Sequence, residues 1–206
     1  MFIALPARHS FGWGKPKVQA ILNRYGNERT RCNEIARNCH AMSTSPTHSL
    51  SSRLLIDTNL LVLFVVGTVN RNRIATFKRT SKYTKQDYDL LVRALNDLTK
   101  PPLYTVAHVL AEVSNLTVLS GPERLRARHV LKQTLTALRE PEMTSVRAAE
   151  ALEYERLGLV DAAIATVARE NKCAVLTDDL DLYLALLKQG IEAFNFWHLR
   201  AREWQV

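Results

Sequence analysis

The stretch LLIDTNLLVLFVVGTV, from Leu54 to Val69, is the most apolar part of the sequence, yet it contains Asp57 and Asn59 near its start. Its length of about sixteen residues falls short of the ~20 apolar residues that a bilayer requires, and Asp57 would lie in the hydrocarbon. We therefore expect no membrane span. The alternative is a buried strand at Leu54–Ile56 that ends at Asp57, followed by a helix that begins near Leu60. Asp57 then lies at the carboxyl end of a strand, where open α/β sheets bind their ligands.

Strands and helices are predicted to alternate through the rest of the chain. Short β-rich runs are separated by segments in which apolar residues recur every three or four positions. This alternation predicts an α/β domain with a parallel sheet of about five strands. Helices are expected from about Lys85, from Val106, over Glu123 to Leu138, and at residues 147–157, 158–170 and 183–190; strands are expected at residues 101–106, around Val146, at Cys173–Leu176 and at residues 192–196.

Composition indicates one ordinary domain preceded by a basic extension. The chain has 206 residues, of which 47% are hydrophobic and 23% charged, as is normal for a soluble protein with a core. The net charge is +8, and residues 1–52 contribute +5 of it, with seven Lys or Arg against two acids. The segment Ser43–Ser52 is polar and contains proline, which is typical of a linker. We therefore expect a basic extension with a linker at residues 1–52 and the α/β domain at residues 53–206.

The chain carries no clear targeting signal. Its start lacks the apolar core of a secretory signal, and three scattered cysteines are too few for a disulfide framework. Both features predict a cytoplasmic protein. The acid-poor residues 1–52 also fit an organelle transit peptide, or an extension upstream of Met42 as the true start. Cys32, Cys39 and His40 lack the second Cys-x-x-Cys pair that zinc sites typically have.

Acidic residues stand at four places where apolar packing would be expected. Asp57 ends the first strand, Glu112 lies at the edge of a helix's apolar stripe, Asp161 opens another helix, and TDDLD at residues 177–181 follows the strand AVLT. Each has a simpler explanation, since the aspartates could cap helices and the glutamate could extend to solvent. Strand ends and helix starts of a parallel sheet converge on one edge, however, so the acids are expected to meet there.

Converging carboxylates require a positive partner. Two carboxylates about 4 Å apart repel by roughly 4 kcal/mol at an effective dielectric constant near 20. Mg²⁺ or Mn²⁺ is the natural partner, because sites built of carboxylate oxygens suit these ions better than zinc. Asn59 would add a neutral amide that positions a ligand or braces Asp57. The sequence therefore predicts a divalent-cation site at the carboxyl edge of the sheet.

No competing catalytic motif is present in the sequence. It contains no G-x-x-x-x-G-K-[ST], G-x-G-x-x-G, G-x-S-x-G or H-E-x-x-H pattern. The six histidines are scattered, and His108, one helical turn before Glu112, is the one that could approach the acidic site. A phosphatase with Asp57 as nucleophile would normally have a second acid two residues later, where this chain has Asn59.

The motifs LLIDTNLLV, VLAEVSNL, GLVDAAIATVA and VLTDDLD, in this order and spacing, resemble those of PIN domains over about residues 53–198. This resemblance implies a three-layer α/β/α fold with strand order 3-2-1-4-5 and an acidic pocket at the carboxyl edge. It also implies a metal-dependent ribonuclease, with the toxins of toxin–antitoxin pairs among its relatives. The partners implied are RNA, an antitoxin protein and a second copy of the chain.

Carried over by position, the resemblance makes Asp57, Glu112, Asp161 and Asp179 the catalytic and metal-binding acids. Asp179 is chosen because it occupies the T-x-D position, and Asp181 is the alternative. Asn59 and Thr177 are supporting residues; Thr177 would hydrogen-bond the scissile phosphate or a carboxylate. A PIN fold that only binds RNA or protein is the rival hypothesis, and the intact set of acids argues against it.

Substrate binding requires cations outside the acidic pocket, because acids alone repel phosphate. The first choice is the basic segment with Lys78, Arg79, Lys82 and Lys85, in which Tyr83 is also found. The second is the helix face with Arg124, Arg128 and Lys132, which are spaced at i, i+4 and i+8. Either group could instead be an ordinary solvated surface.

Overall fold

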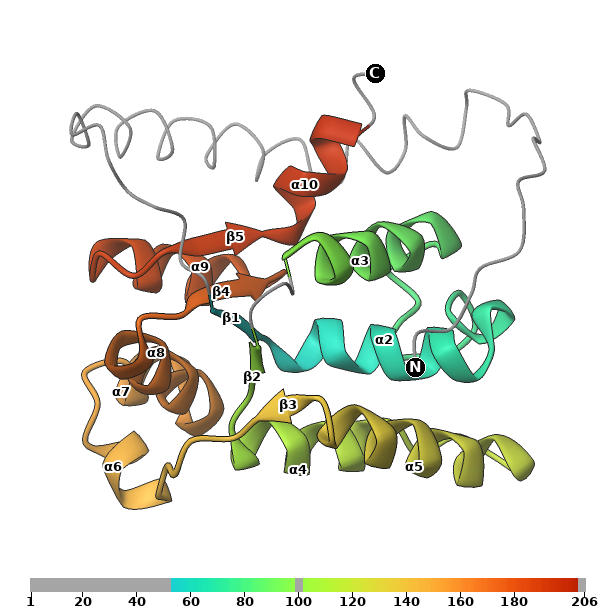
Figure 1. Ribbon diagram of the computed structural model, residues 1–206, viewed down its shortest axis with the longest axis horizontal. Coiled ribbons are helices and arrows are strands. Elements are labelled where there is room, and N and C mark those ends of the chain that lie inside the picture. The colour runs from blue at the N-terminus through green and yellow to red at the C-terminus, as the bar shows by residue number, and fades with distance from the viewer. Residues whose placement is uncertain (1–52, 99–101, 204–206) are drawn as a thin grey trace. The chain divides into compact units, whose positions relative to one another are not determined.

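The computed structural model describes residues 53–98 and 102–203 (Figure 1). The expectations for residues 1–52, namely the basic extension, the linker, the alternative start at Met42 and the cluster of Cys32, Cys39 and His40, lie outside the described residues.

A parallel sheet of five strands forms the centre of the fold. The strands are β1 (Leu54–Ile56), β2 (Leu103–Tyr104), β3 (Leu138–Arg139), β4 (Ala174–Thr177) and β5 (Ala193–Asn195). Their order is β3-β2-β1-β4-β5, and every neighbouring pair is parallel. Helices flank the sheet, so the expected α/β/α class and strand order are confirmed.

The central strands are buried over their whole length. All three residues of β1 and all four of β4 are buried, and Leu54 and Leu55 of β1 pair with Ala174 and Val175 of β4. A strand covered on both faces reads as a continuous apolar run and not as an alternating one, as these two do. The register aligns the carboxyl ends of β1 and β4 at the same edge of the sheet.

Helix α2 (Thr58–Val69) accounts for the rest of the apolar stretch. It begins two residues earlier than expected, and Leu60–Leu63, Val65 and Val66 are all buried. Apolar residues on every side are typical of a helix surrounded by other elements, and α2 packs against α3 (Lys85–Leu98), α4 (Ala107–Leu116) and α5 (Pro122–Leu135). Among residues 53–98 and 102–203, none of the helices has the length and apolar composition needed to cross a bilayer.

The second half of the chain supplies the remaining helices. They are α6 (Ser145–Ala149), α7 (Tyr154–Leu157), α8 (Leu159–Asn171), α9 (Leu180–Lys188) and α10 (Phe196–Glu203), and a short 3-10 helix, η1 (Arg71–Arg73), follows α2. Helix α8 packs against α4, α6, α7 and β4, whereas α9 packs against β4 and β5. The chain thus returns to the sheet from α8 through β4 to α9, which brings the starts of both helices to the carboxyl edge.

Two sequence-based assignments were wrong. The strand expected around Val146 is helix α6, which begins where the Thr144 hydroxyl accepts a hydrogen bond from the amide of Arg147. The remaining strand of the sheet is instead β3 at Leu138–Arg139, where the helix expected over Glu123 to Leu138 was to end. That helix, α5, stops at Leu135. Strand β3 therefore occupies the place next to β2 in the sheet. Val146 pairs with none of the described strands and is 68% exposed.

The long helix expected over residues 147–157 is interrupted, and a further helix was missed. Residues 150–153 separate α6 from α7. Helix α10 follows β5 directly, at residues for which no helix was predicted. Its large apolar residues, Phe196, Trp197 and Leu199, all lie in its first half, so they span too short a stretch to show a helical period in the sequence.

Candidate functional site

An acidic pocket lies at the carboxyl edge of the sheet. Asp57 follows β1 directly, Asp179 is the residue before α9, Asp161 lies in the first turn of α8, and Glu112 lies on α4. The pocket has a volume of about 190 Å³ and every residue that lines it is polar. The lining consists of Asp57, Thr58, Asn59, Glu112, Asp161 and Asp179.

Asp57 is buried and both of its oxygens are hydrogen-bonded. The amide of Thr58 donates to Oδ1 at 2.6 Å, so Asp57 caps α2, and the Thr177 hydroxyl donates to Oδ2 at 2.8 Å. Burial, followed by the negative charge of Asp178, raises the pKa of Asp57 to about 8. Asp57 therefore caps a helix, as its simpler explanation in the sequence proposed, and it also lines the pocket.

Thr177 links the two strand-end acids. Its hydroxyl donates to Asp57 and accepts a hydrogen bond from the amide of Asp179 at 2.9 Å. Asp179 in turn caps α9, since its Oδ1 accepts from the amide of Leu182 at 3.0 Å. The expected hydrogen bond from Thr177 to a carboxylate is thus present, and it fixes the spacing between β1 and β4 at this edge.

Glu112 is oriented into the pocket by a neighbour from another element. The Thr58 hydroxyl, in the first turn of α2, donates to Glu112 Oε2 at 2.8 Å. A glutamate that simply extended to solvent would make no such contact. Thr58 therefore holds Asp57 through its amide and Glu112 through its hydroxyl, a role that the sequence analysis did not assign to it.

Asp161 faces other carboxylates across the pocket. Helix α8 begins after Gly158, whose φ of +86° favours glycine, so Asp161 is not the N-cap that its simpler explanation required. Burial, followed by the charges of Asp179 and Glu112, raises the pKa of Asp161 to about 7, whereas Arg156 acts in the opposite direction. Asp161, Asp179 and Glu112 line the same pocket and lie within electrostatic reach of each other.

The donor set fits a hard divalent cation. Carboxylate oxygens and one amide are the ligands that Mg²⁺ and Mn²⁺ prefer. In the described part of the chain, however, no group of three or more His, Cys, Asp or Glu side chains is arranged to hold an ion as it stands. The side chains share a pocket without forming a closed coordination shell, as mutual repulsion of carboxylates would produce.

A family model of the PIN domain matches residues 54–185. The chain belongs to the PIN domain family. No curated protein is similar enough to the chain to count as a match. PIN domains are generally nucleases and generally use divalent metal ions. The match spans β1 to most of α9 and includes all four acids of the pocket, whereas β5 and α10 lie beyond it.

Two other acids near the end of β4 differ from the four in the PIN domain pocket. Asp181, the alternative fourth acid, is exposed on α9 and does not line the pocket. The side chain of Asp178 is completely buried; Tyr83 Oη donates to its Oδ2 at 2.5 Å, and Lys82 Nζ lies 2.5 Å from the same oxygen. Sequence reasoning missed this cluster because no pattern links residues that are 95 positions apart.

His108 also lies outside the lining of the pocket. Its Nε2 is 3.0 Å from the Ser145 hydroxyl at the start of α6. This contact connects α4 to α6. His108 therefore has a structural contact and is not part of the acidic pocket.

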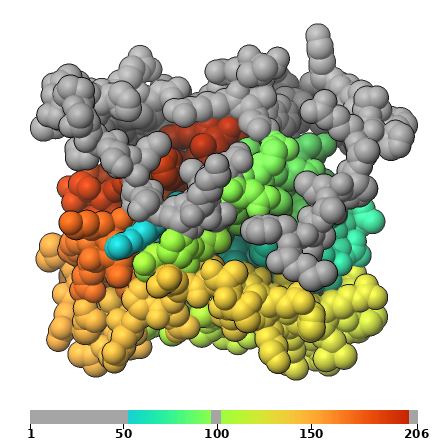
Figure 2. Space-filling view, viewed as in Figure 1, coloured from blue at the N-terminus to red at the C-terminus, as the bar shows by residue number. Residues whose placement is uncertain are grey.

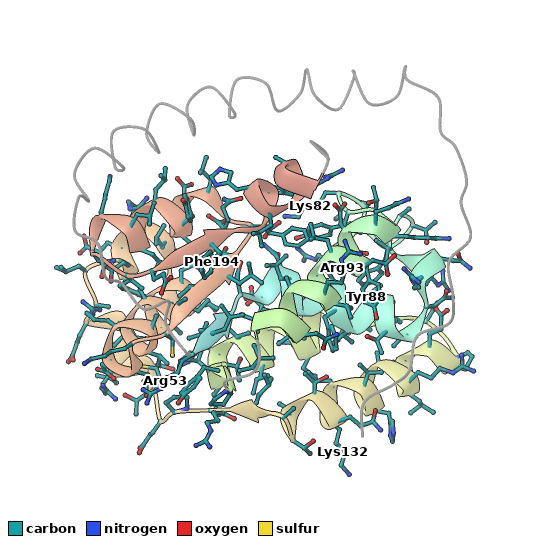
Figure 3. The ribbon with its side chains drawn as sticks, turned by 45° about the horizontal axis from the view of Figure 1, so that its top comes forward. Arg53, Lys82, Tyr88, Arg93, Lys132 and Phe194 are labelled. Atoms are coloured by element: carbon teal, nitrogen blue, oxygen red, sulfur yellow. The ribbon has the colours of Figure 1, made fainter. Side chains whose placement is uncertain are left out.

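The cations predicted to bind RNA lie in different environments. Lys78 and Arg79 are exposed, Lys82 is held by Asp178, and Lys85 Nζ donates to Asn72 Oδ1 at 2.5 Å. Figure 2 shows α5 at the surface in yellow, and Figure 3 shows Lys132 pointing away from that helix. The three cations of the second choice, Arg124, Arg128 and Lys132, are all exposed.

Proposed function

We propose that this PIN domain protein is an endoribonuclease that depends on Mg²⁺ or Mn²⁺ and hydrolyses RNA phosphodiester bonds. One observation carries the proposal: four acids from distant parts of the chain line one small pocket, and none of the six lining residues is a cation. Buried carboxylates without a positive partner are costly, so a function that supplies a cation accounts for their presence.

Asp57, Glu112, Asp161 and Asp179 would hold the ion. When bound there, a divalent cation supplies Lewis acidity, which activates water as a nucleophile and neutralises the charge that develops on the phosphate. The hydrogen bonds from Thr58 and Thr177 fix the Asp57 carboxylate before any ligand arrives. Preorganised donors of this kind avoid a reorganisation penalty during reaction.

Glu112 and Asn59, which both line the pocket, have distinct roles in the proposal. Glu112, oriented by the Thr58 hydroxyl, would bind the ion or accept a proton from the attacking water. Asn59 lines the same pocket and carries an uncharged amide, which can donate a hydrogen bond to a phosphate oxygen without adding to the negative charge. Phosphate approach is otherwise opposed by four acids.

Binding of the RNA backbone is assigned to cations outside the pocket. Lys82 and Lys85 already contact Asp178 and Asn72, which leaves the exposed Lys78 and Arg79 and the α5 face with Arg124, Arg128 and Lys132 as the candidates. Each phosphate contact that is lost should weaken RNA binding regardless of sequence and reduce its salt dependence.

Cleavage of labelled RNA by the purified chain tests the proposal. We expect cleavage with Mn²⁺ or Mg²⁺, none after addition of EDTA, and loss of activity by ~100-fold or more in Asp57→Asn, because replacing even an outer partner of a metal ligand typically costs roughly 10- to 100-fold. Circular dichroism and the melting temperature report whether the variant is folded. Equal cleavage by folded Asp57→Asn would refute the proposal; phosphate release from small phosphoesters without RNA cleavage would favour a phosphohydrolase instead.

A role as the toxin of a toxin–antitoxin pair is the finer form of the proposal, and the family match alone supports it. Expression of the chain in cells should then arrest growth, and Asp57→Asn should relieve the arrest. Light scattering of the purified chain would test the proposed homodimer. An antitoxin would be recognised as a protein that binds the wild-type chain and suppresses its cleavage of RNA.

A further inference from the structure

The buried carboxylate of Asp178 is anchored by the segment between α2 and α3. Tyr83 Oη and Lys82 Nζ both contact its Oδ2 at 2.5 Å. The other oxygen, Oδ1, is buried and has no hydrogen-bond partner among the residues that the structure describes. The carboxylate is therefore held from one side, by two neighbouring residues that lie more than 90 positions away in the chain.

The position of Asp178 matters because of its neighbours in sequence. Thr177 on one side donates to Asp57, and Asp179 on the other side lines the pocket. The amide of Asp179 also donates to the Thr177 hydroxyl, so residues 177–179 form one hydrogen-bonded turn. A displacement of Asp178 would thus move both acids that end the central strands.

Helix α10 holds the ring of Tyr83 in place. The ring stacks on Trp197, with centroids 5.7 Å apart and planes inclined by 13°, and it meets Phe196 edge-on at 6.3 Å. Arg200 Nε reaches Asp87 Oδ1 at 3.0 Å, which ties α10 to the start of α3. Figure 3 shows Lys82 beside α10. Tyr83 itself is only 2% exposed, so its hydroxyl has little freedom to leave Asp178.

We propose that Tyr83 is a positioning residue of the acidic pocket, which fixes Asp178 through its hydroxyl and is itself fixed by α10. The proposal rests on the proposed function, because it assigns a task relative to the same metal-binding acids. It gives α10, which lies beyond the family match that ends at residue 185, a part in supporting the site. It also gives Lys82 a place in this anchor instead of on an RNA-binding surface.

The substitution Tyr83→Phe tests the proposal, because it removes one hydroxyl while it leaves the stacked ring and the formal charge unchanged. Residues that orient a metal ligand typically change metal affinity or activity by roughly 10- to 100-fold, and Tyr83 would orient Asp179 through the adjacent Asp178. We expect the dissociation constant for Mn²⁺, measured by titration calorimetry on the full chain, to rise within that range. The kcat for RNA cleavage should fall, and the KM for RNA should stay the same.

Tyr88→Phe is the matched control. The Tyr88 hydroxyl lies 3.1 Å from the Thr68 hydroxyl on the exposed side of α2, and neither residue lines the acidic pocket. This variant should keep the wild-type affinity for Mn²⁺ and the wild-type kcat. Wild-type affinity in Tyr83→Phe, or an equal loss in both variants, would overturn the proposal and leave Tyr83 with a packing role.

The wild-type chain separates this inference from the proposed function. A wild type that binds Mn²⁺ but cleaves no RNA overturns the ribonuclease, while the affinities of the two variants still decide the role of Tyr83. A wild type that binds Mn²⁺ and cleaves RNA, together with an unaffected Tyr83→Phe, overturns the positioning role alone. A wild type that binds no Mn²⁺ overturns both.

Discussion

The contacts and the burial of Asp57 have opposite effects on the pKa of its side chain. Its carboxylate caps α2 and accepts a hydrogen bond from Thr177, and both contacts favour the charged form. Burial and the nearby charge of Asp178 outweigh them and raise its pKa. The folded, metal-free protein therefore favours the neutral form of Asp57, whereas a bound cation would favour the charged form. The stability of the metal-free protein should accordingly depend on pH.

The metal-free protein is expected to lose stability as the pH rises. Asp57 has a folded-state pKa of about 8 against an ordinary value of 3.8, so between these values the folded chain retains a proton that the unfolded chain has released. The free energy of unfolding therefore falls from about pH 4 to about pH 8, by an amount on the order of a few kcal/mol. Asp161, with a pKa of about 7, adds to this fall. Urea unfolding in EDTA at several pH values measures it.

Asp57→Asn should remove the larger share of that pH dependence and make the metal-free protein more stable at about pH 8. Glu140→Gln is the control, because Glu140 is an exposed acid that follows β3. A variant Asp57→Asn with the same dependence as the wild type would show that Asp57 ionises freely in the folded chain.

Sequence reasoning identified the acids of the pocket from local patterns, because Asp57, Asp161 and Asp179 stand at a strand end or a helix start and Glu112 borders the apolar stripe of a helix. Asp57, Glu112, Asp161 and Asp179 share the pocket as expected. Asp178 and Tyr83 carry no such pattern, since their contact depends on how the segment after η1 packs against the end of β4. Burial and pairing at this distance in sequence depend on tertiary structure.

At the scale of elements, α2 depends on a close approach to α3. Gly67 lies on α2, and a Cβ atom at that position would come within 2.2 Å of the Tyr88 ring. Tyr88 is further held by its contact with Thr68 and by the guanidinium of Arg71, which lies 5.4 Å from the ring centroid. Because Gly67 has no side chain, α2 and α3 can approach each other closely at this point.

Gly67→Ala should destabilise the protein, although alanine is the better helix former by about 1 kcal/mol. Overpacking of a core contact typically costs about 1–3 kcal/mol, and each kcal/mol lowers the melting temperature of a chain of this size by roughly 2–4 °C. Thermal unfolding measures the change. In a Tyr88→Ala background the same substitution should be neutral or stabilising; a raised melting temperature in the wild-type background would contradict the close approach.

Elements with strong local signals were predicted well, and weakly marked ones were not. The strands β1 and β4 are continuous apolar runs, and α4 and α8 have regular apolar spacing, so each was found near its actual bounds. Strand β3 has only two residues, Leu138 and Arg139, and they closely follow a helix whose pattern was expected to continue to Leu138. Its position follows from pairing with β2, which sequence periodicity does not report.

At the scale of the whole molecule, the pocket joins elements from both halves of the chain. Asp57 and Glu112 come from the first half of residues 53–206, and Asp161 and Asp179 come from the second half of that range. A cation shared among them would cross-link β1, α4, α8 and the start of α9. Because such a site does not exist in the unfolded chain, the free energy of metal binding becomes free energy of folding.

Mn²⁺ should therefore raise the melting temperature, and more so at about pH 8 than at about pH 6. A ligand at ~100 times its dissociation constant adds about 2.7 kcal/mol of stability, which corresponds to roughly 5–10 °C for a chain of this size. At about pH 6 protons compete with the ion, since Asp57 and Asp161 have pKa values of about 8 and about 7. Differential scanning calorimetry with Mn²⁺ and with EDTA at both pH values measures the effect.

The same experiment on variants locates the ion. Asp57→Asn should lose most of the rise in melting temperature, whereas Glu140→Gln should keep it, because Glu140 does not line the pocket. An equal rise at both pH values, or a full rise in Asp57→Asn, would mean that Mn²⁺ binds elsewhere on the chain. The acids at the carboxyl edge would then be helix caps and packing residues, without a shared ligand to explain their convergence.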